Sequence, residues 1–220
     1  MDNELRLVRL TSNTEIADGV FVITFKRDFE FTAGQVIGIS IEDNTNNNMP
    51  RLYSIASGED EAQVTILFNI KDDGWLTPQL ATYKAGDAIY ITAPSGSFVN
   101  TNEPAHWIAA GTGIAPFRSM LRSGLTTPKT LIQGGRFKNS FYFEDEFKVH
   151  NQLKYIRCCS QENDAELYSG RLTVYLKEQS SLPSDQKYYL CGSPEMVVEV
   201  RDILISKHIP YENIIAEIYF

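Results

Sequence analysis

The sequence predicts a two-domain protein: a six-stranded antiparallel β-barrel, followed by an α/β domain built on a five-stranded parallel sheet. Over the first hundred residues, short β-branched or alternating segments are separated by turn residues, which is typical of a closed or nearly closed barrel. Farther along, apolar runs alternate with amphipathic stretches, which indicates parallel strands joined by helical crossovers. We therefore predict domains at residues 1–101 and 102–220.

The expected strands are short, and Gly-containing turns such as Asp18-Gly19 and Ala33-Gly34 lie between them. The barrel strands are expected at residues 5–10, 20–26, 36–41, 51–56, 64–70 and 88–92, with one short helix at 76–83. The strands of the second domain are expected at residues 106–110, 130–133, 155–159, 188–191 and 214–219. Its helices are expected at residues 116–123, 144–150, 172–178 and 194–207.

The composition is that of an ordinary globular protein, because 43% of the 220 residues are hydrophobic and 22% are charged. The net charge of -8 argues against nucleic acid as a partner, since phosphate binding requires a basic face. No apolar run is long enough to span a bilayer, and the acidic N-terminus does not look like a secretory signal. Cys158, Cys159 and Cys191 lack metal-ligand spacing. We therefore predict a reduced, cytoplasmic protein with no metal site and no iron–sulfur cluster of its own.

The segment Arg51-Leu52-Tyr53-Ser54 is the first candidate for ligand binding. On a strand, Arg51 and Tyr53 point to one face, while Leu52 and Ser54 point to the other. A guanidinium that can bind a phosphate, next to a flat ring, suits a ligand that is part pyrophosphate and part aromatic tricycle. The Ser54 hydroxyl could then reach a ring nitrogen of that ligand. The alternative is an edge strand with a surface arginine and a half-buried tyrosine.

A second candidate lies where the first strand of the α/β domain meets its helix, at Gly111-Thr112-Gly113. The two glycines allow a sharp turn and bring backbone N–H groups close to a bound group. Pro116 suits the first turn of the following helix, where no backbone donor is lost. Such a turn most often binds the pyrophosphate of a dinucleotide, although it can also be a purely structural connection.

Two further turns also place a glycine shortly before an expected helix. Cys191-Gly192 ends the fourth strand of the second domain, and a helix starts directly afterwards at Ser193-Pro194. Cys191 therefore lies at a carboxyl strand end, where open α/β sheets bind ligands, although free cysteine is most often a small buried apolar residue. Because no base lies nearby in the sequence, we do not interpret Cys191 as a nucleophile. Gly74-Trp75-Leu76-Thr77 could contact a pyrophosphate or simply begin a helix.

Taken together and in this order, these motifs resemble the ferredoxin–NADP⁺ reductase superfamily over nearly the whole chain. The motifs that carry the resemblance are Arg51-Leu52-Tyr53-Ser54, Gly74-Trp75-Leu76-Thr77, Gly111-Thr112-Gly113-Ile114-Ala115-Pro116, Cys191-Gly192-Ser193-Pro194-Glu195-Met196 and the ending Glu217-Ile218-Tyr219-Phe220. The resemblance implies an FAD-binding barrel and an NAD(P)-binding α/β domain.

The resemblance also implies a role for each motif. Arg51 pairs with the flavin phosphate, Tyr53 covers one face of the isoalloxazine, and Ser54 reaches toward N5. Leu52 belongs to the same motif, and Gly74, Trp75 and Thr77 belong to the segment that would hold the pyrophosphate from the other side. The dinucleotide would bind at Gly111, Thr112, Gly113 and Pro116. Cys191 and Gly192 would lie beside the nicotinamide, Glu217 would serve proton transfer, and Tyr219 with Phe220 would shield the second flavin face. The expected catalytic residues are Ser54, Cys191 and Glu217.

The choice between NADPH and NADH depends on side chains near the 2′-phosphate. Arg136 and Arg171 match two basic positions of bacterial family members, although both could be ordinary surface charges. Where those members carry Ser-Arg-Glu, this chain has Ser160-Gln161-Glu162, so one guanidinium is missing and a carboxylate remains. We therefore expect only a slight preference for NADPH over NADH.

The function that follows is an FAD-dependent NAD(P)H oxidoreductase, in which hydride passes from nicotinamide C4 to flavin N5. Single electrons then pass to a ferredoxin, a flavodoxin or an oxygenase component supplied as a separate protein. One alternative is a reductase of small acceptors such as free flavin, ferric chelates or quinones. Another is a flavoprotein subunit or sensor with low turnover.

Overall fold

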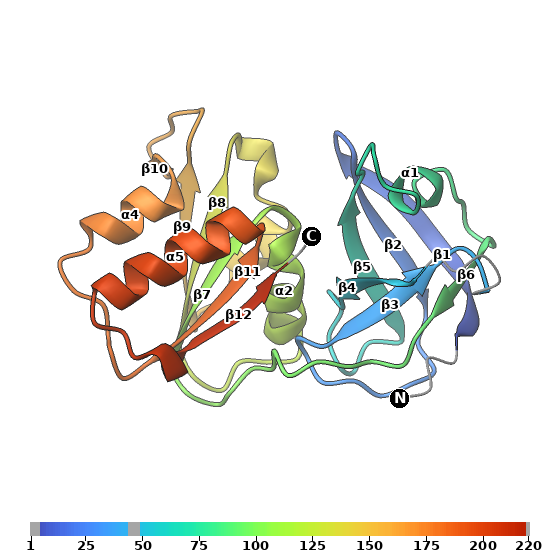
Figure 1. Ribbon diagram of the computed structural model, residues 1–220, viewed down its shortest axis with the longest axis horizontal. Helices are drawn as coiled ribbons and strands as arrows, with labels where there is room; N and C mark the ends of the chain where they lie inside the picture. Colours follow the sequence, from blue (N-terminus) through green and yellow to red (C-terminus); the bar gives the residue numbers. More distant parts are fainter. Residues whose placement is uncertain (1–4, 44–48, 219–220) are drawn as a thin grey trace. The chain divides into compact units, whose positions relative to one another are not determined.

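The computed structural model describes residues 5–43 and 49–218 (Figure 1). Its contacts divide the chain into two compact units. One unit contains Met1–Asn100 together with Arg118–Ser123, and the other contains Thr101–Phe117 together with Gly124–Phe220. Each unit has its own sheet and its own hydrophobic core.

The first unit is an antiparallel sheet in the strand order β4-β3-β6-β1-β2-β5. Its strands are β1 Arg6–Ala17, β2 Val20–Lys26, β3 Val36–Ser40, β4 Arg51–Ser54, β5 Gln63–Asn69 and β6 Ala88–Ile91. The one-turn helix α1, Thr77–Leu80, lies between β5 and β6. A backbone bridge between Ile55 and Ile66 joins the segment after β4 to β5, so the two edge strands of the sheet meet. The predicted antiparallel barrel class is confirmed.

Alternation along the strands builds the barrel core. On β2, Ile23 and Phe25 are fully buried, while Thr24 between them is partly exposed. The same period of two places Ile37 and Ile39 of β3 inside the barrel. One contiguous apolar cluster therefore supports all six strands from within.

The second unit is a parallel sheet in the strand order β10-β9-β8-β7-β11-β12. Its strands are β7 Ala105–Ala110, β8 Lys129–Gly135, β9 Leu153–Cys159, β10 Tyr168–Ser169, β11 Lys187–Gly192 and β12 Ile214–Ile218. Its α-helices are α3 Glu144–Lys148, α4 Leu172–Glu178 and α5 Pro194–Ser206, and its 3₁₀ helices are η1 Gly111–Ile114, η2 Lys138–Ser140 and η3 Tyr211–Asn213. The helix α2, Ala115–Arg122, begins in this unit, and its residues from Arg118 onward group with the first unit. Figure 1 shows α4 and α5 side by side over one face of this sheet. The parallel α/β fold is confirmed, with six strands instead of the expected five.

The additional strand is β10, which pairs with Cys158 and Cys159 of β9 and ends at Ser169, just before Gly170. Two residues are too short to produce a periodic pattern in the sequence, so pattern analysis misses this strand.

The strand order fixes where a ligand can bind. The chain runs from β7 outward through β8 and β9 to β10, and then crosses to the other side of β7 to form β11 and β12. The order therefore reverses between β7 and β11. Open α/β sheets bind ligands outside the carboxyl ends of the strands at such a point.

Candidate functional site

The predicted flavin segment forms strand β4, which pairs with β3. Arg51 is exposed, Tyr53 is partly buried and Ser54 is 2% exposed. The Leu52 side chain is 62% exposed, so Leu52 contributes little to the core. The strand thus presents a guanidinium and part of an aromatic ring at the barrel surface, and a buried hydroxyl on its other face.

The Tyr53 ring packs partly against the barrel core, and its edge meets Phe68 with the ring centroids 6.4 Å apart. Burial raises the pKa of Tyr53 to about 12, although the nearby Arg51 charge opposes this increase. The phenol is therefore neutral at physiological pH. The exposed part of the ring is available for stacking, as the predicted role requires.

The segment Gly74–Thr77 lies in the same unit and precedes or enters α1. The Thr77 hydroxyl is buried and accepts a hydrogen bond from the Lys71 N–H at 2.8 Å. The Gly74 N–H donates to the Lys71 carbonyl at 2.8 Å. Trp75 packs partly against the barrel core, as Tyr53 does. The Thr77 hydroxyl thus closes the turn that leads into α1.

In the second unit, β7 leads through η1 directly into α2. Gly111 has φ +56, in the left-handed region, and no atom lies within 4 Å of where its Cβ would be. At Gly113, a Cβ would come within 2.5 Å of the Cys191 carbonyl carbon and within 2.8 Å of the Gly192 nitrogen. Only a glycine at position 113 therefore lets η1 touch the end of β11, whereas Gly111 faces open space.

The structure brings the predicted residues of this domain together at one edge of the sheet. Ala109 of β7 pairs with Cys191 of β11, and Cys191 pairs in turn with Glu217 of β12. Cys191 is fully buried, while Glu217 is partly exposed. The α5 helix begins here as predicted, because the Ser193 hydroxyl caps it by accepting from the Met196 N–H at 3.4 Å. Tyr219 and Phe220 lie outside the described residues.

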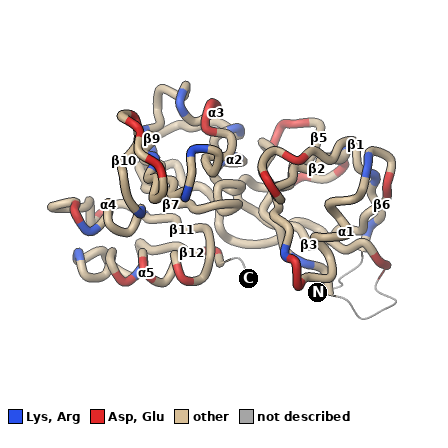
Figure 2. The backbone as a smooth tube through the Cα atoms, turned by 90° about the horizontal axis from the view of Figure 1, so that it is seen from above, with Lys and Arg blue, Asp and Glu red and all other residues tan. Residues whose placement is uncertain are grey.

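Arg136 follows the end of β8, and Arg171 immediately precedes α4; both side chains are exposed. The loops after β8 and β9 are connected by backbone hydrogen bonds, since Ser160 N–H donates to Gly135 and Gln161 N–H donates to Arg136. Figure 2 shows basic and acidic residues interspersed along the chain. The carboxylates of Glu162 and Asp164 lie on the loop after β9, which the Gln161 N–H joins to Arg136.

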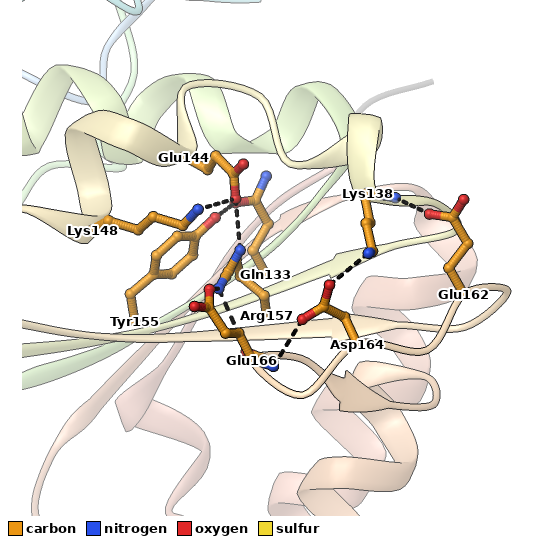
Figure 3. A network of polar contacts seen from close by, with 9 residues as sticks. All are labelled: Gln133, Lys138, Glu144, Lys148, Tyr155, Arg157, Glu162, Asp164 and Glu166. Atoms are coloured by element: carbon orange, nitrogen blue, oxygen red, sulfur yellow. Dashed lines mark hydrogen bonds and ion pairs between the residues drawn. The ribbon is translucent and has the colours of Figure 1, made fainter.

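A polar network that the sequence did not indicate connects these loops (Figure 3). The Lys138 backbone N–H donates to a Glu162 carboxylate oxygen at 2.6 Å, and the Lys138 ammonium pairs with Asp164 at 2.5 Å. Asp164 and Glu162 therefore offset much of the positive charge of Lys138. No motif marks these contacts, because the partners are 24 to 26 residues apart in the sequence.

A second part of the network is centred on Arg157, whose side chain is 12% exposed (Figure 3). Arg157 of β9 pairs with Glu144 of α3 at 2.8 Å and with Glu166 at 3.2 Å. Lys148 also pairs with Glu144, at 3.0 Å. These groups line a cavity of about 190 Å³. Its cations all have carboxylate partners, so this part of the network stabilises the loops.

His106 lies at the opposite end of β7 from the glycine turn. It is 9% exposed and stacks on Tyr188 with the ring centroids 4.6 Å apart. Burial lowers the pKa of His106 to about 4, and a hydrogen bond with Gln186 opposes this shift. The imidazole is therefore neutral at physiological pH and serves packing.

Among residues 5–43 and 49–218, no three His, Cys, Asp or Glu side chains form a group that could hold a metal ion. The same residues include no helix long and apolar enough to cross a membrane. The three cysteines are free and buried.

Two family models match the chain in succession. Residues 7–100 match the oxidoreductase FAD-binding domain, and residues 107–202 match the oxidoreductase NAD-binding domain. The two matches meet close to the division between the barrel and the parallel sheet, and together they cover most of the chain.

Curated relatives agree with these domains. The flavodoxin/ferredoxin–NADP reductase of Escherichia coli strain K12 is 26% identical over 212 residues, which cover 86% of this chain and 85% of the relative. The toluate 1,2-dioxygenase electron transfer component of Pseudomonas putida is 25% identical over 85% of this chain. The terephthalate 1,2-dioxygenase reductase component 2 of a Comamonas species is 28% identical over 88% of this chain. The aligned regions span 58% and 62% of these two dioxygenase components.

Among solved structures, a ferredoxin NADP⁺ reductase from Neisseria gonorrhoeae with bound FAD and NADP has the same fold. Its TM-score is 0.89 at 19% identity, and the superposition covers 99% of both chains.

Proposed function

Since the chain belongs to the ferredoxin–NADP⁺ reductase superfamily of FAD- and NAD(P)-binding oxidoreductases, we propose that it oxidises NADPH or NADH and delivers electrons to a separate protein. The observation that carries the proposal is the meeting of two glycine-containing strand ends, Gly111–Gly113 and Cys191–Gly192, where the strand order reverses. The proposed acceptor is a ferredoxin, a flavodoxin or an oxygenase component.

The glycine turn fits a dinucleotide. The space beside Gly111 is open, and the N-terminus of α2, with Pro116 in its first turn, points its backbone donors to the same end. Residues that would hold the dinucleotide are Gly111, Thr112, Gly113, Pro116 and Gly192. We propose that Cys191, which is fully buried near the end of β11, lies beside the nicotinamide.

Strand β4 fits FAD. The exposed Arg51 guanidinium would bind a phosphate through charge-assisted hydrogen bonds, and the accessible part of Tyr53 would stack on the ring system. We propose that Ser54, which is buried on the other face of the strand, reaches toward the flavin N5, and that Gly74, Trp75 and Thr77 lie along the pyrophosphate. When bound, FAD accepts a hydride from the nicotinamide and releases electrons one at a time.

Glu217 is the proposed proton-transfer residue. Its carboxylate lies on β12 beside Cys191 and is partly exposed, so it can exchange protons with solvent. Tyr219 and Phe220 follow Glu217 after one intervening residue, Ile218, and we propose that they cover the flavin in the absence of nicotinamide.

We also propose that the chain uses NADH nearly as well as NADPH. Arg136 and Arg171 supply exposed positive charge that favours a 2′-phosphate. Glu162 and Asp164 oppose it, and the Lys138 ammonium, which pairs with Asp164, offsets part of their negative charge. The opposing charges leave a small net discrimination between the two nucleotides.

We propose that the chain acts in the cytoplasm together with its partner. Because the chain has a net charge of -8, electrostatic steering of a strongly acidic partner would be weak. A less acidic ferredoxin or an oxygenase component suits this charge better.

Anaerobic stopped-flow spectroscopy tests the proposal. We expect the purified protein to retain FAD, to be bleached by NADPH or NADH, and to be reoxidised by an added ferredoxin or flavodoxin. Reoxidation only by free flavin, ferric chelates or quinones would instead support a reductase of small acceptors. A yellow protein that neither nucleotide bleaches would contradict the proposal and support a low-turnover flavoprotein.

A further inference from the structure

The segment that leaves strand β4 is fixed to the barrel on one side. Directly after Ser54, Ile55 forms the backbone bridge to Ile66 of β5. The Ala56 N–H donates to the Thr65 carbonyl at 2.8 Å, and the Ser57 hydroxyl accepts from the Thr65 N–H at 3.1 Å. Ser57 is fully buried. The Ile55 N–H donates instead to the Gln35 carbonyl at 3.0 Å, so this segment is bound both by β5 and by the residue that precedes β3.

The carbonyl groups of the same segment are bound by residues from much later in the chain. Residues Arg118–Ser123, which comprise the last five residues of α2 and the residue after it, group with the barrel unit. A guanidinium nitrogen of Arg118 donates to the Ala56 carbonyl at 3.0 Å, and the Ser119 hydroxyl donates to the Ser57 carbonyl at 2.7 Å. Both side chains are buried, with Arg118 9% and Ser119 0% exposed.

Outer contacts continue this attachment toward the surface. Glu61 pairs with Arg122 at 2.5 Å and also accepts from the Gly58 N–H at 2.6 Å. The Ser123 hydroxyl accepts from the Glu59 N–H at 3.0 Å. A Cβ at Gly58 would come within 2.9 Å of the Arg122 carbonyl oxygen, so the two backbones approach closely. Contacts therefore run without a break from the buried Arg118 and Ser119 to the more exposed ion pair of Arg122 with Glu61.

We propose that Arg118 and Ser119 are positioning residues for the FAD-binding strand, which they hold through the carbonyls of Ala56 and Ser57. This inference rests on the proposed role of β4 in FAD binding. β4 has four residues and β3 as its partner in the sheet, so the segment that follows it sets the placement of Ser54 and Tyr53. Loss of a buried donor leaves a carbonyl without its partner, and the segment shifts to find another.

The test compares Arg118→Met, which keeps apolar volume but removes the donors, with Arg118→Lys and Ser119→Ala in the full-length protein loaded with FAD. The readouts are the FAD dissociation constant and the visible circular dichroism of the bound flavin. We expect Arg118→Met to raise the dissociation constant about tenfold and to change the spectrum, and Arg118→Lys to recover part of both. Ser119→Ala should produce a smaller change in the same direction.

Arg9→Met is the matched control, because Arg9 also donates to a carbonyl in this unit, that of Gly86 at 2.8 Å. It should leave FAD affinity and spectrum unchanged. Wild-type affinity and spectrum in both Arg118→Met and Ser119→Ala would overturn the inference. The same would follow if Arg118→Lys behaved as poorly as Arg118→Met. If Arg51→Ala weakens FAD binding while the Arg118 and Ser119 variants do not, the positioning role is wrong and the proposed function stands. If the wild-type protein binds no FAD, the proposed function itself is contradicted.

Discussion

Replacing Gly113 by alanine tests the geometry on which the dinucleotide site depends. The new methyl carbon would lie 2.5 Å from the Cys191 carbonyl carbon and 2.8 Å from the Gly192 nitrogen. Carbon atoms pack comfortably at about 3.5 Å, so η1 and the end of β11 must separate by roughly 1 Å. Both sides of this contact are backbone, so side-chain rotation cannot relieve the overlap. We expect the free energy of unfolding to fall by about 3 kcal/mol, at the upper end of ordinary overpacking.

The separation should also disturb the turn that receives the nucleotide. We expect the apparent dissociation constant of NADPH, measured from FAD reduction in stopped-flow experiments, to rise at least about tenfold, since misplaced positioning groups are costly. Urea unfolding monitored by circular dichroism gives the stability.

Gly124→Ala is the control for replacing a glycine that has no close contact. Unlike Gly113, Gly124 has a left-handed φ, +95, but no atom lies within 4 Å of its Cβ position. Alanine there should cost about 1 kcal/mol of backbone strain and leave NADPH binding unchanged. If Gly113→Ala has the stability and NADPH affinity of the wild type, the close contact between the turn and β11 is wrong, and with it the main support for the site.

Three further predictions concern single side chains. Arg51→Ala should weaken FAD binding about 10- to 100-fold, as expected for a lost charge-assisted phosphate contact; full FAD occupancy of the variant at low FAD concentration would contradict the role of Arg51. Glu162→Gln should raise kcat/KM for NADPH about fivefold relative to NADH, because one opposing charge near the 2′-phosphate is removed; an unchanged ratio would place the phosphate elsewhere. His106 has its pKa lowered from 6.5 to about 4, so the unfolded state binds more protons between these values and stability should fall as the pH decreases from 6.5 toward 4. The slope attributable to His106 should be up to about 1.4 kcal/mol per pH unit and should disappear in His106→Phe, which keeps the stacking on Tyr188; an identical pH dependence of the urea midpoint in both proteins would refute this.

Much of the fold could be predicted because periodicity and turn residues report it directly. The change from alternating strands to strand–helix pairs distinguished the barrel from the α/β domain. Strand β1 is longer than expected, since it continues to Ala17 through the polar stretch after Leu10. There the pairing with β2 is supported by hydroxyl contacts of Thr11 and Ser12 with Thr24, which no hydrophobic pattern reveals.

The candidate site was partly predictable for a similar reason. Glycines next to strand ends mark turns that can hold phosphate, so Gly111 and Gly192 could be identified from the sequence. Gly113 contacts Cys191 because β11 lies next to β7, and local sequence patterns do not specify strand order. The contacts of Lys138 with Glu162 and Asp164 were missed because they depend on how two loops fold against each other.

The attachment of Arg118–Ser123 to the barrel has a consequence for dissecting the protein into parts. A fragment that stops at Asn100 would end where the first sheet is complete, yet it would lack the donors that bind the Ala56 and Ser57 carbonyls. Cutting the chain after Asn100 would therefore leave the carbonyls of Ala56 and Ser57, next to β4, without these hydrogen-bond donors. An autonomous flavin module would have to be a permuted or spliced chain that carries this piece of α2 along with it.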